Sequence, residues 1–329
     1  MNILLVIRHD ENQHLVLPEV ARELRQLGIR SRVVWDRPAT LKHRIWTLGQ
    51  PTAVVSVLPI RQFMPSWATI WQQAESNKVK EHDLLQAAGI SVPKQIALYQ
   101  GIEPDLSEFG EYVVVKPSRG ACGAAIRMMR RNKARWRPIT IENFSINEIN
   151  ETLIAQEYIH TGPWPISYRV ATVFGEPIYA LRITASKKRP PIHYDFENPN
   201  VFAGKTIVAS SKGCTMDTNV DSEVLEFAKK VHSAFPDLPL LGTDVVRSHD
   251  TGKLFALEVN SGGWTFHLAN ERYDQVKKEF GIDLRTQFGG AKAVARGIYN
   301  RLFWQKEAEF KNSKIKTFVN KTTLEGASV

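Results

Sequence analysis

The chain has few cysteines and no long apolar run. Only two of its 329 residues are cysteines, Cys122 and Cys214, and neither lies in a CxxC motif or beside a Cys/His cluster. Two cysteines cannot build a disulfide framework, and a metal–thiolate site needs more ligands at closer spacing. No apolar stretch approaches the roughly 20 residues that cross a bilayer. These absences exclude a disulfide-stapled domain and predict no contact with a membrane.

A secretion signal is also missing. The one apolar stretch near the N-terminus, Ile3–Ile7, is short and is followed at once by the polar and charged residues Arg8–Glu11. A signal peptide needs a longer apolar core and a cleavage site of small residues. With so few cysteines, the sequence predicts a cytoplasmic location.

The net charge of +9 favours anionic partners, and much of it is local. The basic residues gather at Arg127, Arg130, Arg131, Lys133, Arg135 and Arg137, and in the tail at Lys306, Lys311, Lys314, Lys316 and Lys321. Solvated loops explain such runs more often than a binding surface does. A protein that binds nucleic acid or an acidic partner is the alternative. Only Trp136 supplies an aromatic ring to the first cluster, which argues against nucleic acid.

Length and hydrophobic patterning predict two or three domains. Over the first 74 residues, β-rich runs at Ile3–Ile7, Arg32–Trp35 and Ala53–Leu58 alternate with a helical pattern at Pro18–Leu27. This alternation predicts a small α/β unit with a parallel sheet.

A second unit begins near Asn77. Lys78–Ala88 has the pattern of a helix that ends at Gly89, and Tyr112–Lys116 and Ala124–Met129 read as strands on either side of a glycine-containing turn. A third unit starts at about Leu153. Its predicted strands are Leu153–Ile159, Tyr168–Val173, Ile178–Ile183, Thr243–Val246 and Leu254–Val259, and its predicted helices are Val220–Phe235 and Ala291–Trp304.

The glycine-containing turn follows a lysine at the end of a predicted strand. Neither a GxxxxGK[ST] loop nor a GxGxxG turn that opens a helix is present. Lys116 is instead followed by Pro117–Gly123. A lysine fixed at a strand end can hold its ammonium beside phosphates, while small residues let backbone N–H groups approach them. Taken alone, such a segment is more often only a turn.

Two further features are ambiguous from spacing alone. Gln156–Ile159 lies between two predicted units and can offer backbone groups to a purine edge, or it is an ordinary strand. Arg169 and Arg182 each interrupt an apolar alternation. Arginine keeps its charge, so on an inward face it needs an anion and on an outward face it needs nothing. Both readings stay open.

Oxygen ligands for a metal ion gather near the end of the third unit. Glu258 and Asn260 are two residues apart on a predicted strand and therefore point to the same face. Asp244 lies on the preceding strand, across a turn at Ser248–Lys253. Two carboxylates and an amide oxygen suit Mg²⁺, and buried carboxylates need a cation or good partners.

In this order the features resemble the ATP-grasp superfamily, and most of all the branch of ribosomal-protein glutamate ligases and glutathione synthetases. NKVKEHDLLQAAGISVP is similar to the family's opening helix, and LFALEVNSGG is similar to its metal-binding strand. The resemblance spans roughly residues 77–300. It implies an α/β (α+β) chain in which two α+β subdomains clasp ATP behind a small parallel pre-ATP-grasp domain. The expected units are 1–74, a lid subdomain 75–155, a metal-bearing subdomain 156–305 and a basic tail 306–329.

The resemblance also implies a role for individual residues. Those expected to contact the nucleotide are Lys78, Lys116, Gly120, Ala121, Cys122, Gly123, Gln156, Glu157, Tyr158 and Ile159. Those expected near the γ-phosphate and the acyl phosphate, as catalytic groups, are Lys116, Arg169 and Arg182. Those expected to hold one or two Mg²⁺ (or Mn²⁺) ions are Asp244, Glu258 and Asn260. Asn200 matches the family's substrate loop only loosely.

The implied activity is ligation of a carboxylate to an amine through an acyl phosphate, with release of ADP and phosphate. The acceptor is a small amine or a peptide, and a phosphotransferase of the same fold is the rival, because the motifs report ATP and Mg²⁺ but not the acceptor. A homodimer is expected by analogy alone, because dimers are frequent in the superfamily. Two departures stand out: no acid occurs in His160–Ser167 for the ribose hydroxyls, and Ser167 replaces the usual aspartate before Arg169.

Overall fold

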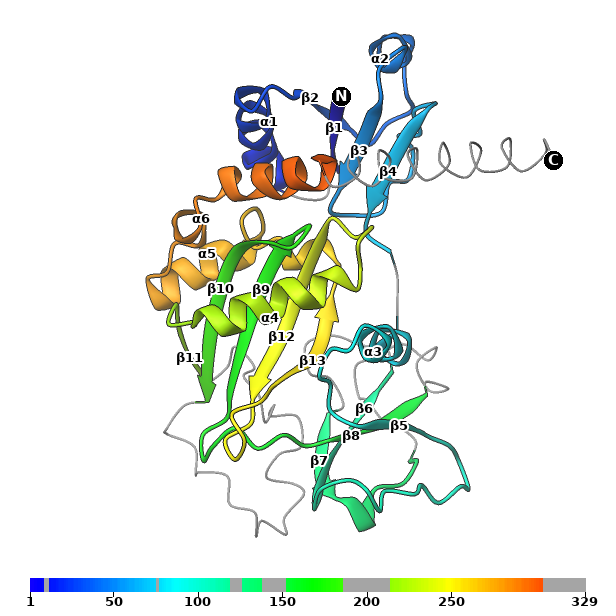
Figure 1. Cartoon of the computed structure of the whole chain (residues 1–329), viewed down its shortest axis with the longest axis vertical. Coiled ribbons are helices and arrows are strands. Elements are labelled where there is room, and N and C mark those ends of the chain that lie inside the picture. The colour runs from blue at the N-terminus through cyan, green and yellow to red at the C-terminus, as the bar shows by residue number, and fades with distance from the viewer. Residues whose placement is uncertain (9–11, 75–76, 119–125, 138–151, 186–213, 304–329) are drawn as a thin grey trace, which may run out of the picture.

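The computed structural model describes residues 1–8, 12–74, 77–118, 126–137, 152–185 and 214–303, which form three sheets (Figure 1). The N-terminal sheet has the order β2-β1-β3-β4, and all its neighbouring strands are parallel, as the sequence predicts. Its strands are β1 (Asn2–Ile7), β2 (Arg30–Trp35), β3 (Thr52–Ser56) and β4 (Ala68–Gln72). Among the described residues no helix is long and apolar enough to cross a membrane.

Helices α1 (Leu17–Gln26) and α2 (Leu41–Thr47) connect these strands. The apolar stripe of α1 is buried against the sheet, and Gly28 ends the helix at φ +79°, a conformation that costs glycine little. On α2, Trp46 packs against the other face of the sheet. The N-terminal unit is therefore a sheet with apolar layers on both faces, as parallel sheets require.

The small sheet has the order β5-β8-β6-β7 and is antiparallel throughout. Its strands are β5 (Gln95–Leu98), β6 (Tyr112–Pro117), β7 (Arg127–Arg130) and β8 (Leu153–Glu157), and a short 3-10 helix η2 (Arg131–Lys133) follows β7. Eight buried side chains form a separate core on this sheet. The expected division at 155/156 lies inside β8, and the domain boundaries stay a prediction.

The basic cluster at 127–137 lies on this unit, and several of its side chains bind partners within the unit. Arg130 lies 3.4 Å from Glu111, Arg135 lies 2.6 Å from Glu103, and Arg131 donates to the carbonyl oxygens of two loop residues. Three of the six basic residues therefore have partners within the small unit. This accounts for half of the cluster without a nucleic acid.

The central sheet has the order β11-β10-β9-β12-β13, and its neighbours are antiparallel. Its strands are β9 (Ile166–Val173), β10 (Glu176–Ala185), β11 (Cys214–Asp217), β12 (Leu240–Arg247) and β13 (Leu254–Asn260). Helix α4 (Ser222–Ser233) covers one face. The other face packs against α5 (Glu271–Phe280), α6 (Leu284–Gln287), the helical residues 291–303 and the N-terminal unit in one continuous core.

Helix α3 (Lys78–Ala87) is attached to the central sheet. Its N-cap Asn77 accepts a hydrogen bond from the Lys80 amide at 2.9 Å. Leu85, together with Ile90 beyond the helix, is buried against residues of β12, β13 and α4. The Ala256 amide of β13 donates to the Ser91 carbonyl at 2.9 Å. Figure 1 shows α3 beside β13, above the small sheet.

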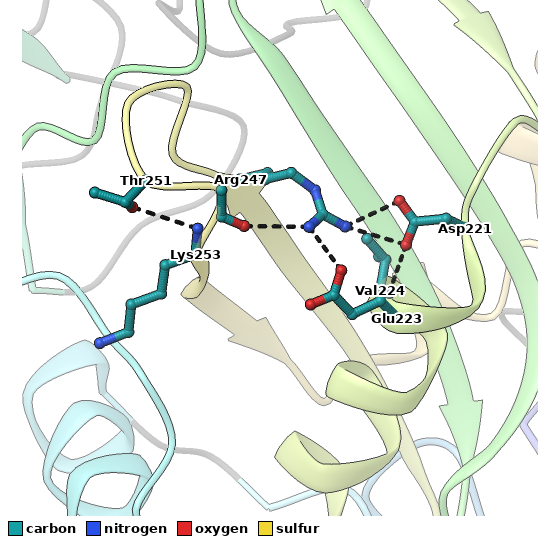
Figure 2. Close-up of polar contacts among 7 residues, drawn as sticks. Asp221, Glu223, Val224, Arg247, Thr251 and Lys253 are labelled. Carbon is teal, nitrogen blue, oxygen red and sulfur yellow. Dashed lines mark hydrogen bonds and ion pairs between the residues drawn. The ribbon is translucent and has the colours of Figure 1, made fainter.

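An arginine joins the end of β12 to the start of α4 (Figure 2). Arg247 contacts Asp221 at 2.9 Å and Glu223 at 2.7 Å, and Asp221 also caps α4 by accepting a hydrogen bond from the Val224 amide at 2.9 Å. A capping carboxylate and an acid in the first turn suit the positive end of a helix. These contacts of Arg247 help to hold α4 over the central sheet.

A buried histidine makes the fold sensitive to acid. His232 of α4 is 2% exposed, its Nε2 lies 2.9 Å from the Leu238 carbonyl and its Nδ1 lies 2.6 Å from the Thr172 hydroxyl. A neutral ring with its proton on Nε2 donates to the carbonyl and accepts from the hydroxyl. Burial lowers the pKa of His232 to about 4.

We expect protonation of His232 to destabilise the protein. Below pH 6.5 the unfolded chain takes up this proton before the folded chain does, so stability falls as the pH drops toward 4, by about 3 kcal/mol in total for this group. Urea unfolding at pH 7, 5.5 and 4 measures the loss. His232→Gln should show a shallower loss than the wild type; an identical pH dependence would contradict the assignment.

Candidate functional site

The two predicted metal-binding acids face each other. Asp244 and Glu258 are cross-strand partners on β12 and β13, and a β-bulge follows directly, between Asp244 and Val245. The Asn260 side-chain amide lies 3.4 Å from Asp244 Oδ2. The antiparallel turn therefore brings together the three oxygen-bearing side chains that the sequence singled out, and a bulge beside them aims strand residues locally, as bulges near active sites do.

Arg169 lies on the adjacent strand β9, directly opposite Asp244. Its Nε donates to Oδ1 of Asp244, and its terminal nitrogen donates to Oδ2 at 2.7 Å. Burial raises the pKa of the Asp244 carboxyl above its ordinary value, while the facing guanidinium acts in the opposite direction. Burial acts to lower the pKa of Arg169, but the Asp244 carboxylate raises it overall. The two side chains form a bidentate, charge-assisted pair.

Lys116 comes to this cluster from the small sheet. Its side chain is 5% exposed in strand β6, and its ammonium donates to Gln156 Oε1 on the neighbouring strand β8 at 3.0 Å. Burial lowers the pKa of Lys116, nearby Glu258 raises it, and Lys78 lowers it further. The ammonium therefore lies within electrostatic reach of the acids on the central sheet.

Lys78 is the first residue of α3 and bridges the two sheets. Its Nζ lies 3.6 Å from Glu258 Oε1, and its backbone amide donates to the Ser118 carbonyl, just beyond β6, at 3.1 Å. The amino end of a helix attracts anions. Two lysines and a helix terminus thus face two carboxylates, an arrangement suited to a polyphosphate bound with a divalent cation.

Arg182 is not part of this cluster. Its neighbours Leu181 and Ile183 pack into the core on the face that carries Arg169, so Arg182 points to the face covered by α4. An acid that it approaches is Asp217, at 4.0 Å. This position gives no support to the expected role beside the γ-phosphate.

The segment expected to line an adenine pocket is partly tied to the small sheet. The amide of Glu157 donates to the Lys94 carbonyl at 2.8 Å, and the amide of Tyr158 donates to the Tyr112 carbonyl at 3.2 Å. Any hydrogen bond to a purine edge would have to use other backbone groups of 156–159. The expected phosphate loop, Gly120–Gly123, and Asn200 lie outside the described residues.

The sequence did not predict one pair of side chains that lies beside Arg169. Tyr179 of β10 stacks on His267, with ring centroids 5.0 Å apart, and its hydroxyl donates to the Thr265 carbonyl at 2.8 Å. Burial, with help from Arg169 and Arg272, lowers the pKa of His267 to about 3. A neutral imidazole therefore lies next to the Arg169–Asp244 pair. His267 lies in an irregular segment, where residue spacing predicts nothing about contacts.

The donor set fits a magnesium ion. Carboxylate and amide oxygens are its preferred protein ligands, and it keeps waters and phosphate oxygens besides. Within the described ranges, no group of three or more His, Cys, Asp and Glu side chains is placed to hold a metal ion, so the candidate set is two acids and one amide. Such a sparse set suits an ion that arrives together with a nucleotide.

Comparisons with solved structures find chains of similar fold. PsnB, an ATP-grasp ligase solved with Mg, ADP and a variant of its minimal precursor, is 15% identical, covers 91% of this chain and 98% of its own, and has a TM-score of 0.51. At such identity the likeness concerns the fold alone. The other matches include D-cycloserine synthetase DcsG (16% identity, covering 92% of this chain and 100% of its own, TM-score 0.48) and D-alanine–D-alanine ligase from Bacillus anthracis (12% identity, covering 94% of this chain and 99% of its own, TM-score 0.47).

A search of curated proteins found no match. The model of one protein family, described as an ATP-grasp domain, matches residues 75–262, which is more than half of the chain. The matched span contains every described residue of the cluster. The chain belongs to the ATP-grasp family.

Proposed function

We propose that the protein is an ATP- and Mg²⁺-dependent ligase that joins a carboxylate to an amine through an acyl phosphate. The observation that carries this proposal is the cluster itself: Lys78 lies 3.6 Å from Glu258, and Lys116 of the small sheet lies within electrostatic reach of Asp244 and Glu258 on the central sheet. Phosphoryl transfer needs such cations and metal-binding oxygens around one point, because its catalysis is mostly positioning and charge stabilisation.

In this proposal an oxygen of the substrate carboxylate attacks the γ-phosphorus of ATP, and the bond to the β,γ-bridging oxygen breaks to release ADP. The amine then attacks the acyl carbon, phosphate leaves, and the amine loses a proton. Asp244, Glu258 and Asn260 would hold Mg²⁺, which supplies neutralisation of phosphate charge when bound. Lys116 and Lys78 position the phosphates. Arg169, which shares a face with Asp244, is the guanidinium best placed to meet the transferred phosphate.

The site must exclude water while the acyl phosphate exists, and the small sheet, 95–157, is the element proposed to cover it. Gln156–Ile159 would contact the adenine. The acceptor is a small amine or a peptide. A peptide is included because the fold is similar to that of PsnB, a ligase solved with a precursor. The rival within the family is a kinase, which would use the same cluster and differ only in the acceptor.

We expect Mg-ATP to stabilise the protein. Nucleotide at about a hundred times its dissociation constant adds roughly 2.7 kcal/mol, which raises the melting temperature by a few degrees in a chain of this size. A thermal melt with ATP, with and without Mg²⁺, measures this. A shift that needs both supports the site, whereas no shift at saturating nucleotide would contradict it. Hydroxylamine then separates the two chemistries: a hydroxamate of the substrate carboxylate indicates the ligase, and a stable phosphoester indicates the kinase.

A further inference from the structure

We propose that Arg169 occupies the metal site in the cation-free protein and that a divalent cation must displace it from Asp244. The inference rests on the proposed function, because it takes Asp244 as a metal ligand. It gives Arg169 a positioning role in the order of binding, in addition to any contact with phosphate.

Both oxygens of Asp244 accept hydrogen bonds. Nε of Arg169 takes Oδ1, the terminal nitrogen takes Oδ2 at 2.7 Å, and the Asn260 amide also approaches Oδ2 at 3.4 Å. Each carboxylate oxygen has two lone pairs, but the guanidinium covers the edge on which both oxygens would bind one ion, and its positive charge repels a cation at the remaining lone pairs. Cation and guanidinium therefore compete for one carboxylate.

Glu258 is held less tightly than Asp244. Its contact with Lys78 is a single one at 3.6 Å, longer than a strong charge-assisted hydrogen bond. Glu258 is thus available to an arriving cation first, and Asp244 joins when Arg169 leaves. The ion pair is not sealed from solvent, since the two side chains are 25% and 24% exposed.

Arginine cannot leave by losing its proton, because its pKa is too high. It can leave only by turning away, and a phosphate group of the nucleotide offers it a replacement anion of matching bidentate geometry. A cation without nucleotide lacks this compensation. The pair thereby favours joint binding of metal and nucleotide over binding of metal alone.

The test is binding of Mn²⁺ without nucleotide, measured by isothermal titration calorimetry on the full chain. If the pair leaves Asp244 free for about a tenth of the time, Arg169→Met should bind Mn²⁺ about tenfold more tightly than the wild type. Arg182→Met is the matched control: it removes an arginine from the neighbouring strand on the opposite face and should leave the affinity unchanged.

Arg169→Lys separates displacement from simple loss of positive charge. It keeps the charge but cannot make the bidentate contact, so it should bind Mn²⁺ more tightly than the wild type and less tightly than Arg169→Met. This variant also carries the test if Arg169→Met fails to fold, as judged by near-ultraviolet circular dichroism. An affinity of Arg169→Lys equal to that of the wild type, or weaker binding in either variant, overturns the proposal.

A parallel titration with ADP present distinguishes the two levels of failure. If the wild type binds Mn²⁺ with ADP but the variants gain no affinity for Mn²⁺ alone, the inference about Arg169 is wrong and the metal site stands. If no protein binds Mn²⁺ with or without ADP, both the inference and the proposed function are wrong.

Discussion

Replacing Glu258 by glutamine should abolish turnover and leave the fold intact. The carboxylate faces Asp244 across the β12–β13 pair and lies 3.6 Å from Lys78, and in the proposed function it holds the metal at the transferring phosphate. A neutral amide of the same shape is a much weaker ligand for a hard cation. We expect activity to fall by at least about a thousandfold, the upper end of what one electrostatic contact contributes. Steady-state release of ADP measures the loss.

The fold should tolerate this change because Glu258 is 23% exposed and, among the residues that the structure describes, makes one loose ion pair, so the melting temperature should move little. Glu176→Gln is a matched control. Glu176 is 24% exposed on β10 and pairs with Arg296, away from the cluster, so its variant should keep full activity. Retained activity in Glu258→Gln would remove the basis of the metal assignment, whereas an unfolded variant would contradict the prediction that the fold tolerates this change.

Lys116→Met should separate stability from activity. The ammonium is buried, 3.0 Å from Gln156 Oε1, and in the proposed function it contacts phosphate. Its loss should lower kcat/KM by about a hundredfold to a thousandfold, as removal of one donor to a developing charge does in other enzymes. Lys94→Met is the control, because Lys94 belongs to the same small unit but is half exposed and pairs with Glu108.

The stability of Lys116→Met should equal or exceed that of the wild type at neutral pH. Burial lowers the pKa of Lys116, so the folded protein holds this proton at a cost that the unfolded chain does not have. An apolar side chain of similar length removes that cost. The free energy of unfolding of the wild type should rise as the pH approaches 10.5, the ordinary pKa of lysine, because the unfolded state then holds more protons than the folded state. A variant destabilised at every pH would contradict this account.

Hydrophobic patterning predicted the long elements and missed the short or polar ones. Strands β1 and β6 were found because their apolar runs are continuous, and β9 and β12 were found because they contain several β-branched residues. Strand β5 has only four residues, and α5 is mostly charged, with only Tyr273 and Val276 buried. Their structure depends on tertiary partners, which local propensity does not encode.

The candidate site was predictable where spacing alone sets geometry. Two residues two apart on a strand must share a face, which brought Glu258 and Asn260 together. The faces of Arg169 and Arg182 depend on the register between β9 and β10, and this register sends them to opposite sides of the sheet. The Arg169–Asp244 pair depends in turn on the register between β9 and β12, which no pattern within either strand reveals.

The attachment of α3 to the central sheet would give the two lysines that are proposed to bind phosphate different times of contact with the nucleotide. Lys78 begins a helix that packs on β13, whereas Lys116 lies on a strand of the small sheet, which has its own core. If the small sheet swings about the segments that join it to α3 and to β9, Lys116 moves with it, and the hydrogen bond from the Lys78 amide to the Ser118 carbonyl has to open while Lys78 stays on the central sheet. An incoming nucleotide would then contact Lys78 first. Lys116 would contact it only after the small sheet has moved, and this movement would be the step that commits the bound nucleotide to react.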